Sequence, residues 1–297
     1  MSPQPIFADG IYRSSDSGLP IRRWCRERLQ QWSVPHSLMS FKTSLGRCMV
    51  VCAGTGMALP PVVIVSGSGL NAATSLPLAC ALKARRRLFL VDLPGQPGLS
   101  SAHGPPHGHF SAYGAWLSEL LPRLTTDPVV IVGHSIGAAA ALACSPSPQV
   151  AGLVLVNPLG FVSMHLSSMF RALRLRWSIF PSMEHSEQLL SQLLSPGFVP
   201  DTPLMSWYCL LGEHCVGLRY DHPLPPTTIH RWATAETPVA VAAGSHDRFL
   251  SADRLRGPVR SLLGVQVQTI HNCGHLAVRE APSAVAAIVE AITSTSR

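Results

Sequence analysis

The sequence predicts an α/β fold: a mostly parallel central sheet of about eight strands, flanked by helices and interrupted by an inserted helical cap. Short apolar runs rich in β-branched residues alternate with helical patterns, which is typical of buried parallel strands with helices on both faces. One such run ends in Gly-His-Ser-Ile-Gly and continues directly into an alanine-rich helix. Residues 158–237 show helical patterns but no strand candidate, and this segment is too long for an ordinary connection.

The expected strands and helices follow one another at short intervals. The first two strands form a hairpin at 37–43 and 47–53. The later strands are expected at 61–66, 87–92, 129–132, 152–156, 238–243 and 265–270. Helical patterns lie between or after them at 73–83, 110–124, 135–144, 251–263 and 280–294.

This order predicts an N-terminal extension (1–37), a core made of 38–157 and 238–297, and a cap (158–237). The extension carries one amphipathic helical pattern at 21–32, and the cap carries two at 167–180 and 184–194. Caps of this kind close over pockets and contact the substrate. We therefore expect substrate-binding side chains among the arginines and aromatic residues of the cap, namely Arg171, Arg174, Trp177, Trp207 and Tyr208.

The composition indicates an apolar globular protein. Of the 297 residues, 46% are hydrophobic and only 13% are charged, about half the usual charged share. The net charge is +7, and 21 of the 23 basic residues are arginine. This bias reflects either genome composition or the attraction of an anionic or carrier-bound substrate. We expect no nucleic-acid partner, because no basic run is interleaved with aromatic residues.

The cysteines and the N-terminus predict a cytoplasmic protein. The eight cysteines form no C-x-x-C pair and are expected to be free thiols. The first residues lack a basic region followed by an apolar one, so no signal peptide is expected. No apolar run reaches 18 residues, so we expect no membrane partner. The chain is expected to be a monomer or a homodimer.

The run Gly133-His134-Ser135-Ile136-Gly137 has the pattern of a nucleophile elbow, a sharp strand-to-helix turn that exposes the serine hydroxyl. A side chain at either glycine position would crowd such a turn. A serine hydroxyl near neutral pH needs a base, a group that orients the base, and donors for the developing oxyanion. The rest of the chain offers a candidate for each.

The expected base and acid both follow strands. His275 stands in a Gly-His turn after the last strand, and we prefer it to His271 at the strand end. Asp247 follows the strand 238–243 and would hold the imidazole in the required tautomer. We prefer Asp247 to Asp253, which suits the first turn of a helix. Asn157, after the strand 152–156, leaves that position without a carboxylate.

The oxyanion donors are expected to be backbone amides. One is the amide of Ile136, the residue after the nucleophile. The other comes from the small-residue loop after the strand 61–66, where Ser68 and Gly69 are both candidates.

Four motifs stand in the order and spacing of a known family: the elbow, the loop from Asp92 to Ser100, Gly-Ser-His-Asp at 244–247, and Gly-His-Leu at 274–276. The chain therefore resembles the α/β-hydrolase fold superfamily over residues 38–294, in particular its carboxylesterase-like members with a helical cap. The family often has His-Gly before the oxyanion loop, where this chain has Ser66-Gly67. The resemblance implies no cofactor.

The expected function is a serine hydrolase that cleaves an ester or thioester of a small to medium acyl substrate through an acyl-enzyme on Ser135. The same three residues could instead serve acyl transfer, cyclisation or the hydrolysis of a carbon–carbon bond. A third possibility is a ligand-binding protein on the same fold. The histidines of the run 103–109 suggest a metal site, but no carboxylate or cysteine joins them, so we expect no metal.

Overall fold

A computed structural model describes residues 10–56, 59–82, 86–105, 110–216 and 222–294 of the chain. Its sheet has eight strands in the order β1-β2-β4-β3-β5-β6-β7-β8, and only the pairings of β2 with β1 and with β4 are antiparallel. The fold class expected from the sequence is therefore confirmed. The strands are β1 (His36–Thr43), β2 (Gly46–Ala53), β3 (Val62–Val65), β4 (Leu88–Val91), β5 (Val129–His134), β6 (Val150–Val156), β7 (Val239–Gly244) and β8 (Val267–Ile270).

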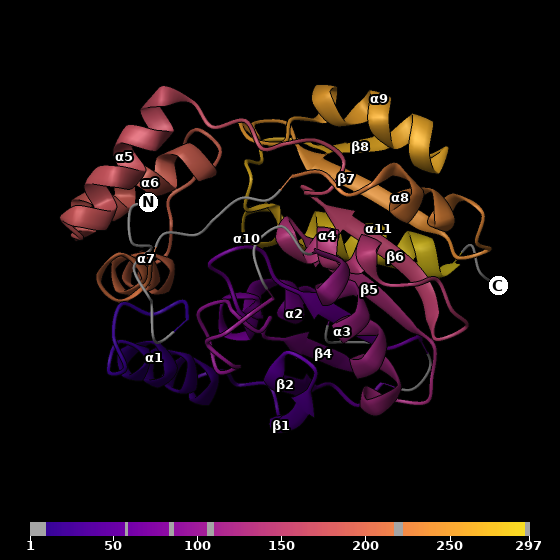
Figure 1. Cartoon of the computed structure of the whole chain (residues 1–297), viewed down its shortest axis with the longest axis horizontal. Helices are drawn as coiled ribbons and strands as arrows, with labels where there is room; N and C mark the ends of the chain where they lie inside the picture. Colours follow the sequence, from indigo (N-terminus) through magenta and orange to yellow (C-terminus); the bar gives the residue numbers. More distant parts are fainter. Residues whose placement is uncertain (1–9, 57–58, 83–85, 106–109, 217–221, 295–297) are drawn as a thin grey trace, which may run out of the picture.

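The central strands are covered on both faces. Every residue of β3, β4 and β5 is buried, although successive side chains of a strand point to opposite faces. One group of packed helices consists of α2 (Leu76–Leu82), α10 (Ala277–Glu280) and α11 (Pro282–Ser294). The other consists of α3 (Phe110–Leu124), α4 (Ile136–Ala143), α8 (Pro226–Ala233) and α9 (Ala252–Leu263) (Figure 1). A short 3-10 helix, η1 (Ala72–Thr74), precedes α2.

The last predicted helix, 280–294, corresponds to α11, and the short helix α10 that precedes it was not predicted. Ala281 lies between them and has φ −134° and ψ 53°, outside the helical region. Pro282 follows it, and a proline disfavours the helical conformation at the residue before it. The break occurs next to the turn that carries His275.

The described residues between β6 and β7 form four helices. We use "cap helices" for three that pack on one another: α5 (Ser168–Ile179), α6 (Met183–Leu193) and α7 (Thr202–His214). The sequence predicted α5 and α6, but α7 and α8 were not predicted. Because α8 packs on α4 and α9, the expected cap range of 158–237 includes one helix that belongs with the core layers.

The N-terminal extension is attached to the cap. Its helix α1 (Gly18–Gln30) packs against α7, and both lie at the left of Figure 1. The backbone of Ile11 and Arg13 exchanges hydrogen bonds with that of Val216 and His214. Among the described segments, every helix is too short or too polar to traverse a lipid bilayer.

Candidate active site

Ser135 lies on a strained turn between β5 and α4. Its φ of 52° and ψ of −114° lie in a region that residues other than glycine rarely adopt. The turn is possible because Gly137 lies against the end of β3, where an added Cβ would come within 2.1 Å of the Val65 carbonyl oxygen. The backbone around Ser135 therefore has the geometry of the nucleophile elbow expected from the sequence.

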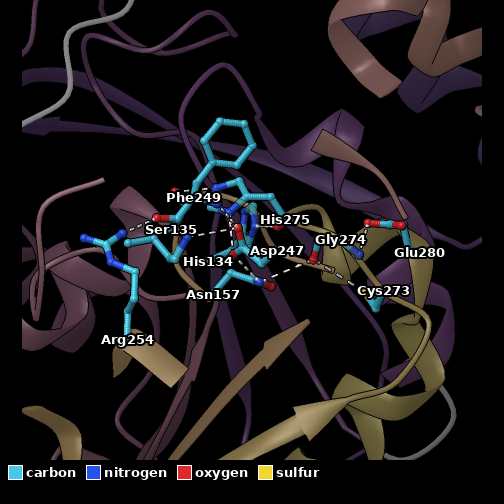
Figure 2. Close-up of polar contacts among 11 residues, drawn as sticks. His134, Ser135, Asn157, Asp247, Phe249, Arg254, Cys273, Gly274, His275 and Glu280 are labelled. Carbon is cyan, nitrogen blue, oxygen red and sulfur yellow. Dashed lines mark hydrogen bonds and ion pairs between the residues drawn. The ribbon is translucent and has the colours of Figure 1, made fainter. Parts of the chain in front are cut away.

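A row of hydrogen bonds joins the three predicted residues. The Oγ of Ser135 is 3.1 Å from the Nε2 of His275, and the Nδ1 of His275 is 2.9 Å from the Oδ2 of Asp247 (Figure 2). All three residues are buried. The two competing residues lie elsewhere: His271 is exposed, and Asp253 is in the first turn of α9, where it pairs with Arg256.

The Asp247 carboxylate is held by four donors. Its Oδ1 accepts hydrogen bonds from the amides of Phe249 and Leu250, and its Oδ2 accepts from the Nδ2 of Asn157 at 2.7 Å and from His275. Burial by itself would raise the pKa of Asp247. The charge and hydrogen bond of His275, together with the hydrogen bonds of the two amides, outweigh this effect and lower the pKa to about 2. The carboxylate is thus ionised at neutral pH and fixes His275 with its proton on Nδ1.

His134, the second residue of the elbow motif, supports the main chain of His275. Its Nε2 lies 2.8 Å from the His275 carbonyl oxygen, so this nitrogen donates and the Nδ1 carries a lone pair. Burial and the nearby charge of His275 lower the pKa of His134 to about 3. His134 is therefore neutral and adds no second positive charge beside His275.

The turn before His275 is fastened to the cap. The Oε1 of Glu280 accepts a hydrogen bond from the Gly274 amide, and its Oε2 accepts one from the amide of Ser195, just after α6. The amide of His275 donates to the carbonyl of Leu193 at 2.7 Å. The position of His275 therefore depends on the end of α6 as well as on β8.

Two side chains hold the loop after β3 through the backbone of Gly69. The Gly69 amide donates to the Oε1 of Gln96 at 3.0 Å, and the Gly69 carbonyl accepts from the Nε1 of Trp207 at 2.7 Å. Of Ser68 and Gly69, the two residues predicted to supply an oxyanion donor, Gly69 therefore has its amide in a hydrogen bond to a side chain. Both residues line the cavity in front of Ser135.

A narrow cavity of about 60 Å³ lies in front of Ser135. Most of its lining is apolar or aromatic and comes from the cap, and Arg174 is the only permanently charged side chain among the described residues that line it. The cap side chains involved are Met164, Phe170, Arg174, Trp177, Leu189, Leu193, Tyr208 and Leu211. The cavity therefore offers an apolar site beside the side chain of Ser135.

Of the five cap residues expected to bind substrate, Arg174, Trp177 and Tyr208 line this cavity. The expectation is wrong in position for the other two. Arg171 is exposed and donates to the carbonyl of Leu166. Trp207 is 0% exposed, and its ring packs 4.6 Å from that of Trp24 while its Nε1 binds the Gly69 carbonyl. A helical sequence pattern does not reveal which face of a cap helix is turned toward the core.

Sequence reasoning missed the supporting roles of Asn157, His134, Glu280 and Gln96. Asn157 carried the clearest signal, because a polar residue directly after a buried strand of a parallel sheet lies at the edge where the ligands of such folds bind. The partners of Gln96 come from distant segments, and no local signal indicates them. The histidine run 103–109 lies partly outside the described residues. Within the described part of the chain, no group of three or more potential metal ligands was found.

The fold and the site define a class of enzymes in which a serine after a central strand is bonded to a histidine–aspartate pair. Residues 62–288 match the model of the Alpha/beta hydrolase family, and this chain belongs to that family. Two solved structures from Bacillus subtilis are similar. Carboxylesterase CesB has 17% identity and a TM-score of 0.76 over 93% of this chain and 98% of its own. Naproxen esterase (carboxylesterase NP) has 18% identity and a TM-score of 0.76 over 94% of this chain and 99% of its own. Among curated proteins, none matched the chain.

Proposed function

We propose that this protein is a serine hydrolase that cleaves an ester or thioester with a small to medium apolar acyl group. The observation that carries the proposal is the row of hydrogen bonds from Ser135 through His275 to Asp247, which begins at an apolar cavity lined by Ser135 and His275. The similarity to carboxylesterases supports the reaction class, and the substrate rests on the cavity.

In the proposed reaction, the Oγ of Ser135 attacks the carbonyl carbon of the substrate, and its proton passes to the Nε2 of His275. The tetrahedral intermediate then expels the alcohol or thiol, which takes that proton from His275. A water molecule, deprotonated by the same nitrogen, releases the acid from the acyl-enzyme. Asp247 stabilises the imidazolium and does not itself take up the proton.

Two backbone amides would stabilise the negative charge on the substrate oxygen. The amide of Ile136 is the first of α4, where the dipole of the helix also favours an anion. The amide of Ser68 is the second donor in this proposal, since the Gly69 amide is bonded to Gln96. Donors of this kind each contribute about 10²–10³ to kcat in serine hydrolases.

The cavity favours short acyl chains. About 60 Å³ corresponds to room for roughly four to six water molecules at about 10–15 Å³ for each. Aromatic and branched side chains surround this space, so an apolar acyl group would fill it at the expense of water. We expect kcat/KM to be highest for short p-nitrophenyl esters and to fall as the acyl chain lengthens.

The nucleophile can be tested by labelling and substitution together. A fluorophosphonate should add one label to the native protein and none to Ser135→Ala, as measured by intact mass. Ser135→Ala should lose about 10⁴–10⁶ in kcat on p-nitrophenyl acetate, while Ser111→Ala, an exposed serine of α3, keeps full activity. Retained turnover or labelling in a folded Ser135→Ala protein would refute the proposal.

A further inference from the structure

The outer surface of the cap carries an unusual concentration of exposed apolar side chains. Nine large hydrophobic residues of the described chain are strongly exposed, and five of them fall between residues 169 and 183. They are Met169 (61%), Leu175 (61%), Ile179 (56%), Phe180 (66%) and Met183 (52%). Exposed apolar residues scattered singly need no explanation, whereas a cluster indicates a contact surface.

Helix α5 divides cleanly into two faces. At about 100° per residue, Phe170, Arg174 and Trp177 fall on one side, and these three residues line the cavity. Ala172, Leu175 and Ile179 follow one another at spacings of three and four residues on the opposite side, and all three are exposed. We call these three residues the outer stripe of α5.

Arginines flank the outer stripe. Arg171 and Arg176 are both exposed, and at helical spacing they lie on opposite sides of the stripe. Helix α5 has three arginines and no acidic residue, and the nearest acids in sequence, Glu184 and Glu187, belong to α6. An apolar stripe bordered by arginines is typical of a helix that lies in the plane of an anionic lipid surface.

The inner face of α5 reaches the proposed catalytic row. The ring of Phe170 packs 4.7 Å from that of Phe249, which lies 5.4 Å from the ring of His275. A surface bound to the outer stripe would therefore be separated from the cavity by about the thickness of one helix, roughly 10 Å. Figure 1 shows α5 at the outer left of the molecule, away from the sheet.

We propose that the outer stripe of α5, with Phe180 and Met183, binds the surface of a bilayer that contains anionic phospholipid. The argument for this occupant is charge complementarity. A two-fold contact between copies centred on the stripe would bring arginines toward arginines without an acid on α5 to pair them. The sequence contains no apolar run long enough for a helix that crosses a membrane. The binding proposed here needs no such run, because α5 would lie on the membrane surface.

Binding is measured with the Ser135→Ala protein, so that the result does not depend on the proposed hydrolase activity. The protein is sedimented with vesicles of phosphatidylcholine alone and with vesicles that also contain phosphatidylglycerol. We expect binding to the anionic vesicles only, weakened by added salt. The double variant Arg171→Gln/Arg176→Gln should bind about thirtyfold more weakly, and Leu175→Ser/Ile179→Ser at least about tenfold more weakly.

The matched control for charge is Arg256→Gln/Arg260→Gln, which removes the same two charges from exposed positions on α9. The matched control for apolar exposure is Leu38→Ser on β1, where Leu38 is 46% exposed. Both controls should bind as the parent does. In the active protein, the α5 variants should keep their kcat/KM on a soluble p-nitrophenyl ester.

The proposal is overturned if the protein binds neither type of vesicle or binds both types equally. It is also overturned if Arg256→Gln/Arg260→Gln weakens vesicle binding as much as Arg171→Gln/Arg176→Gln does. Sedimentation equilibrium without lipid tests the competing occupant. A dimer that dissociates in Leu175→Ser/Ile179→Ser, with no vesicle binding by the parent, would assign the stripe to self-association instead.

Discussion

Replacing Trp207 by phenylalanine tests whether the cap positions the oxyanion loop. The substitution removes the indole N–H that donates to the Gly69 carbonyl at 2.7 Å and keeps an aromatic ring beside Trp24. Gly69 is buried, so its carbonyl would lose this partner where water has little access. The peptide between Ser68 and Gly69 would then be held chiefly through Gln96.

Two magnitudes follow from this change. Leaving a buried carbonyl without its donor costs about 1–3 kcal/mol of stability, or a Tm decrease of roughly 2–4 °C per kcal/mol for a chain of this size class. The effect on the reaction is separate. Losing an oxyanion donor outright costs about 10²–10³ in kcat, and displacing one costs less, so we expect kcat to fall about 10- to 100-fold.

The effect should appear in kcat and leave KM within about twofold. The hydrogen bond from the Ser68 amide strengthens when the carbonyl oxygen becomes an oxyanion, so its loss raises the barrier more than it weakens substrate binding. Steady-state kinetics on a p-nitrophenyl ester and thermal unfolding of the same samples give both quantities.

Trp232→Phe is the matched control. Trp232 is 1% exposed, and its indole N–H donates to the Leu142 carbonyl at 2.9 Å, in α4 and away from the oxyanion loop. It should lose similar stability and little kcat. Equal kcat in the two variants, whether retained or lost, would refute a positioning role for Trp207.

Three further predictions concern polar side chains around the site. Asn157→Leu removes the Nδ2 donor that lies 2.7 Å from the Oδ2 of Asp247 and leaves this buried oxygen with His275 as its side-chain partner, so kcat should fall about tenfold; an unchanged kcat argues against a positioning role for this contact. Burial and the charge of His275 lower the folded-state pKa of His134 from 6.5 to about 3, so the unfolded chain binds a proton first and stability falls as the pH drops below about 6.5. His134→Gln should remove about 1.4 kcal/mol per pH unit of this slope in denaturant titrations, and parallel curves for the two proteins would contradict the assignment. Arg174→Gln should lower kcat/KM about tenfold for an ester that carries a carboxylate and little for a neutral one, and equal losses would remove charge recognition from Arg174.

The strands of the core could be predicted because buried parallel strands have a simple sequence pattern. Strands such as β3 and β5 are buried on both faces, so they appear in the sequence as continuous apolar runs. Ser135, Asp247 and His275 could be found for a related reason. Each follows the end of a parallel strand, and all such ends meet at one edge of the sheet.

The supporting residues could not be predicted in this way, because their partners are far apart in the sequence. Trp207 and Gly69 are separated by 138 residues, and Asn157 and Asp247 by 90. The structure of the cap was also predicted only in part. The aromatic residues of α7 were noticed, but no expected helix covered Thr202–His214, and the two faces of α5 were not distinguished.

The sequence by itself determined the succession of core strands along the chain, the strained turn at Ser135, and the identity of His275 and Asp247 as its partners. These features depend on local backbone preferences and on the regular geometry of parallel sheets. Only the tertiary structure decided that the Gly69 amide is bonded to Gln96, which cap side chains line the cavity, and that Trp207 is bonded to the loop after β3. These depend on how the cap helices are rotated against the core, which packing between distant segments sets and no local pattern encodes.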